Sequence, residues 1–389
     1  MLTLLQNNKD LQISELIFDL IKEQIILNAI STVINLKIPD CLKDGPKTVE
    51  QLAKKTNTHP NSLSRLLRML SSIGIFTKVK ETQEEDGHER IKYGLTPTAS
   101  LLQSNENNML KNFSLLLGRQ SFKRSIDDLQ YVIQTGENSF KHINNLNIFE
   151  YLQQNPVDAK IFNEAMTAMT SSQVSSISAL YDFSQFNTVV DIGGGQGLFL
   201  SSILKDNSNL TGIVFDLPYA IESVEKQQIQ HMDSSSNVDN NGILSRCKFI
   251  SGDFFKSIPS GADGYIIKNV LLNWDDESAS TILKNCLNAM NFSMKSNQKY
   301  KKNNDHKIKP KLIIIDMIMP ENNEISFGNL LDIMMMILTQ NGRIRTKKEF
   351  TILLESCGFE ITNILDSSST SDPMSFLSII EAMPKPISD

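Results

Sequence analysis

The chain has 389 residues, of which 40% are hydrophobic and 21% are charged, so it can form two or three domains with a sizeable core. Its formal net charge of -6 gives no general electrostatic reason to bind nucleic acid or an anionic membrane. The four cysteines form no C-x-x-C pair, and we expect no disulfide framework and no metal site. The sequence also lacks a signal-peptide pattern and a long apolar run, which predicts a cytoplasmic protein without a membrane span.

The N-terminal region contains several helical patterns. Apolar residues recur at helical spacing over residues 12–36, which predicts a long helix. Residues 48–51 read T-V-E-Q, a capping-box pattern that predicts the start of a short helix. A further helix is predicted over residues 63–70, with Asn61 or Ser62 as its N-cap.

Two short strands follow these helices, over residues 75–79 and 91–95, and they flank a charged loop. Helices followed by such a hairpin are typical of a winged helix, which suggests DNA binding. Residues 1–80 hold eleven Lys or Arg and seven Asp or Glu, and the candidate recognition helix carries only Arg65 and Arg68. Because DNA-binding domains usually present a denser basic face, we favour dimerisation, with DNA binding as the alternative.

Residues 106–180 have mainly helical patterns, and from residue 188 onward strand and helix patterns alternate until a final pair of strands. This order predicts an α/β fold with a doubly wound sheet. Two polar inserts, 227–241 and 295–311, are predicted to be surface loops. Seven strands are predicted, over residues 188–192, 211–215, 247–251, 264–268, 312–317, 360–365 and 374–380.

The first strand of this region runs into the pattern D-x-G-x-G-x-G over residues 191–197. Glycines in such a turn allow positive φ and a close approach of the backbone to a ligand. A dinucleotide fingerprint requires G-x-G-x-x-G, which this spacing does not match. The observed spacing is the form used by Rossmann-like methyltransferases that bind S-adenosylmethionine (SAM), although an ordinary tight turn also collects glycine. Asp216, at the end of the second strand, lies where ribose hydroxyls are bound, or it caps the next helix.

Further motifs show that nearly the whole chain resembles the plant-type small-molecule O-methyltransferases, such as the caffeic acid and hydroxyindole enzymes. The resemblance implies SAM-dependent methyl transfer to a hydroxyl of a small aromatic molecule and a homodimer formed through the N-terminal domain. It divides the chain into a winged-helix-like dimerisation domain (1–105), a helical linker and substrate-pocket segment (106–180), and a SAM-binding domain with a Rossmann-like, seven-stranded sheet (181–389). The motifs, besides the glycine turn, are Y-G-L-T-P-T at 93–98, F-N-E-A-M at 162–166, F-D-L-P at 215–218, G-D-F-F at 252–255, N-W-D-D-E at 273–277 and R-T-K-K-E-F at 345–350.

The resemblance also implies which residues bind the cofactor. Gly193 would lie beside the methionine part of SAM, and Asp216 would bind the ribose hydroxyls. Asp253 would accept from the adenine amino group, Phe254 would pack on the adenine ring, and Lys268 would contact the cofactor as well. The full set is Gly193, Gly195, Asp216, Asp253, Phe254 and Lys268.

The sequence departs from the family at the residues that remove the proton from the acceptor hydroxyl. The family uses a histidine as general base, and this chain has Leu272 at that position, followed by Asn273 in place of an aspartate. Of the two acids that orient the histidine, the first corresponds to Asp316, one methylene shorter than the usual glutamate. The second is replaced by Ile344. The catalytic residues are therefore unknown from the sequence.

Three explanations remain open. The protein methylates an acceptor that is acidic enough to ionise without a base, since orientation alone contributes to rate. A different residue serves as base, for which His142 is the candidate. Alternatively, the chain is a catalytically weak or inactive SAM-binding partner of an active methyltransferase. Met166 and Met334–Met336 could line a soft apolar wall around an aromatic acceptor, or they are ordinary core residues.

Overall fold

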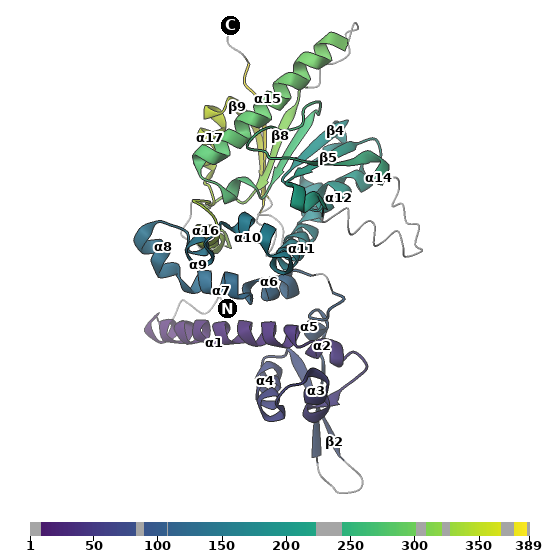
Figure 1. Ribbon diagram of the computed structural model, residues 1–389, viewed down its shortest axis with the longest axis vertical. Coiled ribbons are helices and arrows are strands. Elements are labelled where there is room, and N and C mark those ends of the chain that lie inside the picture. The colour runs from purple at the N-terminus through teal and green to yellow at the C-terminus, as the bar shows by residue number, and fades with distance from the viewer. Residues whose placement is uncertain are drawn as a thin grey trace. The chain divides into compact units, whose positions relative to one another are not determined.

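The computed structural model describes residues 9–82, 89–106, 108–222, 243–300, 309–320, 327–366 and 377–386 (Figure 1). The chain forms two compact units. The first consists of Met1–Lys123 with Lys160–Ala168, and the second of Arg124–Ala159 with Met169–Asp389. The three-segment division expected from the sequence stays a prediction.

The first unit contains helices and a small antiparallel sheet in the strand order β1-β3-β2, in agreement with the predicted helix-and-hairpin pattern. The capping box is present, because Thr48 Oγ1 accepts from the backbone of Gln51 and the Gln51 side chain accepts from the backbone of Thr48. The elements are α1 (Lys9–Asn35), α2 (Ile38–Cys41), β1 (Lys47–Thr48), α3 (Val49–Thr56), α4 (Pro60–Ser72), β2 (Phe76–Thr82), β3 (Glu89–Leu95), α5 (Pro97–Ser100) and α6 (Met109–Leu117).

One capping prediction in this unit is wrong. Neither Asn61 nor Ser62 is the N-cap of α4, because the helix already begins at Pro60. His59 is the cap, and its Nδ1 accepts from the backbone N–H of Ser62 at 3.4 Å. Proline suits the first helical position because its ring fixes φ and its missing N–H would have no helical partner there.

The second unit is built on a seven-stranded sheet in the order β6-β5-β4-β7-β8-β10-β9, which confirms the predicted doubly wound fold. Strands β4 to β8 pair in parallel, and β10 is antiparallel to both β8 and β9. The strands are β4 (Thr188–Ile192), β5 (Thr211–Asp216), β6 (Cys247–Ser251), β7 (Gly264–Lys268), β8 (Lys311–Asp316), β9 (Phe359–Asp366) and β10 (Ser378–Pro384).

Helices cover this sheet and fill the segment that precedes it. α7 (Gln120–Asp127) crosses the boundary between the units, and α11 has its residues 160–168 in the first unit. The other elements are α8 (Leu129–Thr135), α9 (Ser139–Asn144), α10 (Ile148–Gln154), α11 (Pro156–Leu180), η2 (Phe183–Gln185), α12 (Leu198–Asp206), α14 (Ile243–Arg246), η3 (Leu271–Asn273), α15 (Asp276–Tyr300), α16 (Phe327–Leu338) and α17 (Lys347–Ser356).

The predicted loop over residues 295–311 is partly wrong, because α15 continues to Tyr300. Lysine and glutamine lower the hydropathy of this segment, but both are good helix formers, so a polar composition does not exclude a helix. Residues 301–308, the predicted loop 227–241 and residues 374–376 of the last predicted strand lie outside the described residues.

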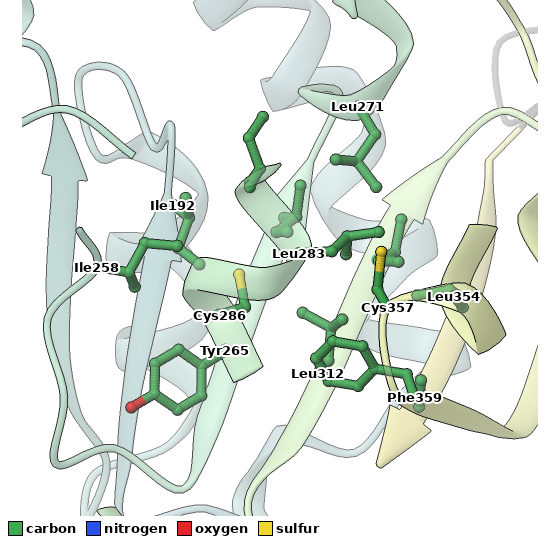
Figure 2. Close-up of a cluster of buried hydrophobic side chains, with 14 of the residues drawn as sticks. Ile192, Ile258, Tyr265, Leu271, Leu283, Cys286, Leu312, Leu354, Cys357 and Phe359 are labelled. Carbon is green, nitrogen blue, oxygen red and sulfur yellow. The ribbon is translucent and has the colours of Figure 1, made fainter. Parts of the chain in front are cut away.

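The two faces of the sheet carry separate cores. One packs under α15 and α17, and Figure 2 shows Ile192 and Tyr265 of the sheet near Cys286 of α15. The other packs under α11 and α12 and includes Ile266 and Phe199. Because successive strand residues point to opposite faces, the side chains at the carboxyl ends of the strands are divided between the two faces in the same way.

Candidate active site

The glycine turn follows β4 at the carboxyl edge of the sheet and opens α12. Gly193, Gly195 and Gly197 have φ of 72°, 57° and 77°, in the left-handed region that glycine adopts without strain. A Cβ on Gly193 would lie 2.7 Å from Cγ2 of Val270. The turn therefore has the close-packed, positive-φ geometry that the sequence predicts.

Asp216 ends β5 beside this turn. Its Oδ2 accepts from the backbone N–H of Gly195 at 2.7 Å, and its Oδ1 accepts from the N–H of Leu217 at 2.6 Å. Burial raises the pKa of Asp216, and the two backbone N–H groups oppose that shift. The Asp216 carboxyl thus connects the turn after β4 with the turn after β5 through hydrogen bonds, so that one ligand can contact both turns.

Asp253 and Phe254 follow β6, the next strand of the sheet. Asp253 Oδ1 accepts from the backbone of Phe255 at 2.9 Å. Phe254 packs edge-on to Trp274, with ring centroids 6.2 Å apart, and its ring lies 3.8 Å from the Cβ position of Gly193. An aromatic face is thereby brought beside the glycine turn, as an adenine-binding residue requires.

Lys268 ends β7 and is buried. Its Nζ donates to Thr170 Oγ1 of α11 at 3.2 Å, and burial lowers the pKa of its ammonium to about 8. Asp191 is the last residue but one of the neighbouring strand β4, is 1% exposed, and has an Oδ2 without a hydrogen-bond partner in the described structure. Burial raises the pKa of Asp191 to about 7, while the Lys268 charge opposes the shift. The sequence gives Asp191 as part of the glycine motif but offers no signal for Thr170.

These residues fit SAM by their chemistry. The edge offers a glycine turn in which Gly193 has no room for a Cβ, carboxyl groups for donors, an aromatic ring and a buried lysine. A buried carboxyl oxygen without a partner is unfavourable in the free protein, so the unpartnered oxygen of Asp191 indicates a ligand that brings a donor.

The acceptor side of the edge is different. Leu272 lies in η3 and packs with Met317, Met335 and Ile344, none of which can take a proton. Met334 borders this group, which we call the Leu272 cluster. Met336 is not among its members, and Met166 belongs to the first unit. The absence of a base at Leu272, inferred from the sequence, is therefore accompanied by apolar packing.

Asp316 ends β8 and is 1% exposed. Its Oδ1 accepts from the backbone of Met317 at 2.9 Å, and its Oδ2 has no partner in the described structure. Burial raises the pKa of Asp316 to about 7, although the Arg345 and Lys268 charges oppose the shift. The retained acid of the family pattern is thus buried beside the turn that carries Leu272, whose backbone N–H also opposes the pKa shift.

Arg345 fixes the turn that carries Leu272, and sequence reasoning gave it no role beyond the family motif. Its side chain is fully buried. It donates to the carbonyl oxygens of Leu271 and Trp274, both at 2.8 Å, and to Asp276 Oδ1 at 2.9 Å. A five-donor guanidinium can satisfy several fixed acceptors at once, which explains an arginine here.

His142, the candidate replacement base, lies on α9 outside the Leu272 cluster. Its Nδ1 is 2.8 Å from Asp128 Oδ2, and its ring stacks on Tyr131 with centroids 3.8 Å apart. About half of its side chain is exposed. α9 packs against α16, which carries Met335 of the Leu272 cluster, but His142 itself pairs with Asp128 and Tyr131, and its assignment as base stays a prediction.

The described residues contain no group of three or more histidine, cysteine or acidic side chains arranged to hold a metal ion. None of their helices has both the length and the apolar character to cross a bilayer.

Comparisons with known proteins agree with the fold. Residues 126–360 match the O-methyltransferase domain, and residues 18–105 match the O-methyltransferase dimerisation domain, which supports a homodimer. The chain is 32% identical to the phenazine O-methyltransferase PhzM of Lysobacter antibioticus over 96% of both chains. It is 28% identical to the 8-amino-8-demethylriboflavin N,N-dimethyltransferase of Streptomyces davaonensis, over 85% of this chain and 86% of that protein. The solved structure of LaPhzM covers 96% of this chain and 99% of its own length, with a TM-score of 0.80 and 32% identity.

Proposed function

Because the chain belongs to the SAM-dependent O-methyltransferase family, we propose that it methylates a hydroxyl of a small, largely apolar aromatic molecule without a histidine base. The observation that carries the proposal is the contrast at the carboxyl edge: the polar groups expected for SAM are present, and the Leu272 cluster is apolar. The cytoplasmic location and the absence of nucleic-acid partners remain predictions.

The methyl transfer divides into tasks that these residues can perform. When bound, SAM supplies an electrophilic methyl group on a positively charged sulfur. Gly193, Gly195, Asp216, Asp253, Phe254 and Lys268 would hold it. The Leu272 cluster would press an aromatic acceptor against the site and exclude water, and orientation of this kind contributes several kcal/mol.

The missing base limits the acceptor. General-base catalysis contributes about 10²- to 10⁴-fold, so a neutral phenol with a high pKa would react slowly here. A hydroxyl that ionises near neutral pH needs no base. The relative in Lysobacter antibioticus is described as acting on a phenazine, which agrees with an extended aromatic acceptor.

The second candidate function is a catalytically weak or inactive SAM-binding partner of an active methyltransferase. It is favoured by the joint replacement at Leu272 and Ile344, since the two side chains pack together and neither leaves a polar partner for the other. Loss of both members of a hydrogen-bonded pair costs less than loss of one.

Methyl transfer from labelled SAM to a panel of phenols of graded acidity, at pH 7 and pH 9, tests the proposal. SAM binding is measured in parallel, and the corresponding methyl ethers serve as acceptor-free controls. Turnover that rises with pH toward the pKa of each phenol supports an enzyme that relies on ionisation of the acceptor. Binding of SAM without turnover on any phenol supports the partner function.

A further inference from the structure

A shallow depression on the first unit is lined mainly by lysine side chains. Its volume is about 550 Å³, and its walls come from β1, β3 and α3. None of the lining residues is acidic, although the chain as a whole carries a net charge of -6. The lining residues, which we call the lysine pocket, are Pro46, Lys47, Gln51, Lys54, Lys55 and Lys92.

α3 supplies half of the lysine pocket. Its buried residues include Leu52 and Ala53, whereas Gln51, Lys54 and Lys55 are exposed. Positions three and four apart are neighbours on a helix, so both lysines lie on the same side of α3 as Gln51. The last turn of a helix favours cations, and this preference alone accounts for the two lysines on α3.

The other two lysines lie on strands, where no helix dipole explains them. Lys92 of β3 pairs with Thr48, the N-cap of α3, and Lys47 directly precedes Thr48. Lys47 and Lys92 are both half-buried. Pro46 packs against β3, since a Cβ on Gly94 would lie 3.3 Å from Pro46 Cγ. The start of α3 and the strand pairing thus bring lysines from three elements to one depression.

The positive charge of the lysine pocket is not balanced by acids in its walls. Lys47, Lys54 and Lys55 have no ion pair or hydrogen-bond partner among the described residues. Glu50, the acid in the first turn of α3, is not a lining residue. Like charges around one depression repel each other, so a bound anion would lower the electrostatic energy of the first unit.

The lining also indicates the kind of anion. Pockets of several hundred Å³ that bind uncharged small molecules have mostly apolar walls, and this one does not. A lysine ammonium offers three donor hydrogens and acts as a point charge, which suits phosphate oxygens. Because the four ammonium groups come from two strands and a helix, a chain of phosphates matches them better than a single phosphate.

The surroundings of the lysine pocket favour a compact anion over a nucleic acid. α4, the helix that follows α3, carries only Arg65 and Arg68 as basic residues. A domain that binds duplex DNA usually presents a dense basic face along its recognition helix. The positive charge is instead gathered at one depression at the start of α3.

We propose that the lysine pocket binds a polyphosphate group, either as a free polyphosphate or as the triphosphate of a nucleotide. Lys47, Lys54, Lys55 and Lys92 donate to its oxygens. The pocket lies wholly within the first unit and shares no residue with the set proposed to hold SAM, so neither proposal depends on the other.

Calorimetry with the full chain at low ionic strength tests this assignment. Inorganic tripolyphosphate is the main probe, because it has no adenine and so does not report on the proposed SAM site. Orthophosphate, cytidine triphosphate and a short DNA duplex are measured beside it. Lys47→Gln and Lys54→Gln each remove one charge from the pocket, and glutamine keeps the helix propensity of lysine at position 54. Lys43→Gln is the matched control, since Lys43 is an exposed lysine near the pocket but not in its lining.

Tripolyphosphate should bind more tightly than orthophosphate. Lys47→Gln and Lys54→Gln should each weaken it by about 3- to 10-fold, since each removes a charge-assisted hydrogen bond, and Lys43→Gln should stay within about twofold. Cytidine triphosphate that binds more tightly than tripolyphosphate supports a nucleotide as the source, and equal affinity supports a free polyphosphate.

Three results would overturn the assignment. The first is no binding of tripolyphosphate at about 1 mM, and the second is an equal loss in Lys43→Gln. The third is DNA that binds more tightly than tripolyphosphate and is weakened as much by Arg65→Gln as by Lys54→Gln, which would make this surface a nucleic-acid site.

Discussion

The cofactor side and the acceptor side of the same sheet edge differ in which of the family's polar residues they retain. On the cofactor side, Asp191 and Lys268 are buried and Asp216 is half-buried, and hydrogen bonds hold Asp216 and Lys268 in place. On the acceptor side, only a few residues along the chain from Lys268, Leu272 packs into an apolar cluster with Ile344. In the proposed function, the methyl donor and the acceptor therefore contact different residue sets, although the Lys268 charge acts on Asp316 across the boundary between them.

We expect the largest loss of stability when the contacts that fix the turn carrying Leu272 are removed. Arg345→Met leaves two carbonyl oxygens and one carboxyl oxygen without their donor, which we expect to cost about 3 kcal/mol and to lower the melting temperature by about 4–6 °C. Arg343→Met is the matched control, since Arg343 pairs with the same Asp276 but is 41% exposed, and an exposed pair contributes at most about 1 kcal/mol. Equal melting temperatures of the two variants would show that the Arg345 contacts do not fix the turn.

On the cofactor side, Asp216→Ala removes the carboxyl that joins two turns and, as proposed, binds the ribose. We expect the affinity for SAM to fall by about 30- to 150-fold, as measured by calorimetry. Asp206→Ala, at the exposed end of α12, should leave it unchanged. Unchanged affinity in Asp216→Ala would remove the ribose assignment.

Asp316, at the boundary between the two sides, should make the free energy of unfolding depend on pH. Its folded pKa of about 7 exceeds the ordinary value of 3.8, so the folded protein binds more protons than the unfolded chain between these values. The contribution of this group to stability is therefore full at low pH and is lost as pH rises through about 7. Asp316→Asn removes this titration.

Relative to the unaltered protein, Asp316→Asn should gain up to about 1.4 kcal/mol per pH unit between pH 5 and pH 7. Urea unfolding midpoints at pH 5, 6 and 7 measure the trend, and Asp191, which titrates in both proteins, cancels in the comparison. A difference that is constant with pH would mean that Asp316 keeps an ordinary pKa.

The smallest expected effect concerns the base itself. Leu272→His places an imidazole in an apolar cluster in which one orienting acid is replaced by Ile344, so we expect turnover of a weakly acidic phenol to rise less than about tenfold. The double variant Leu272→His with Ile344→Glu should exceed the single variant. A large gain from Leu272→His alone would show that Asp316 suffices to orient the imidazole.

The sequence predicts the sheet well because its strands are local apolar runs. The predicted bounds of β4, β6 and β7 coincide with the structure, and the glycine turn has its expected conformation. The contacts of Arg345 and Thr170 could not be predicted, because their partners come from distant parts of the chain. The continuation of α15 to Tyr300 was missed because polarity alone does not distinguish a solvated helix from a loop.

The position of β10 has a consequence for how the protein is made. β10 lies between β8 and β9, so β9 joins the sheet only through a strand that follows it in the chain. During translation, β8 and β9 are synthesised first and keep open edges until residues 378–384 leave the ribosome. Open strand edges favour association with other chains. The sheet is therefore completed only once residues 378–384 have been synthesised, and a chain that stops before residue 378 would lose two strand pairings at once.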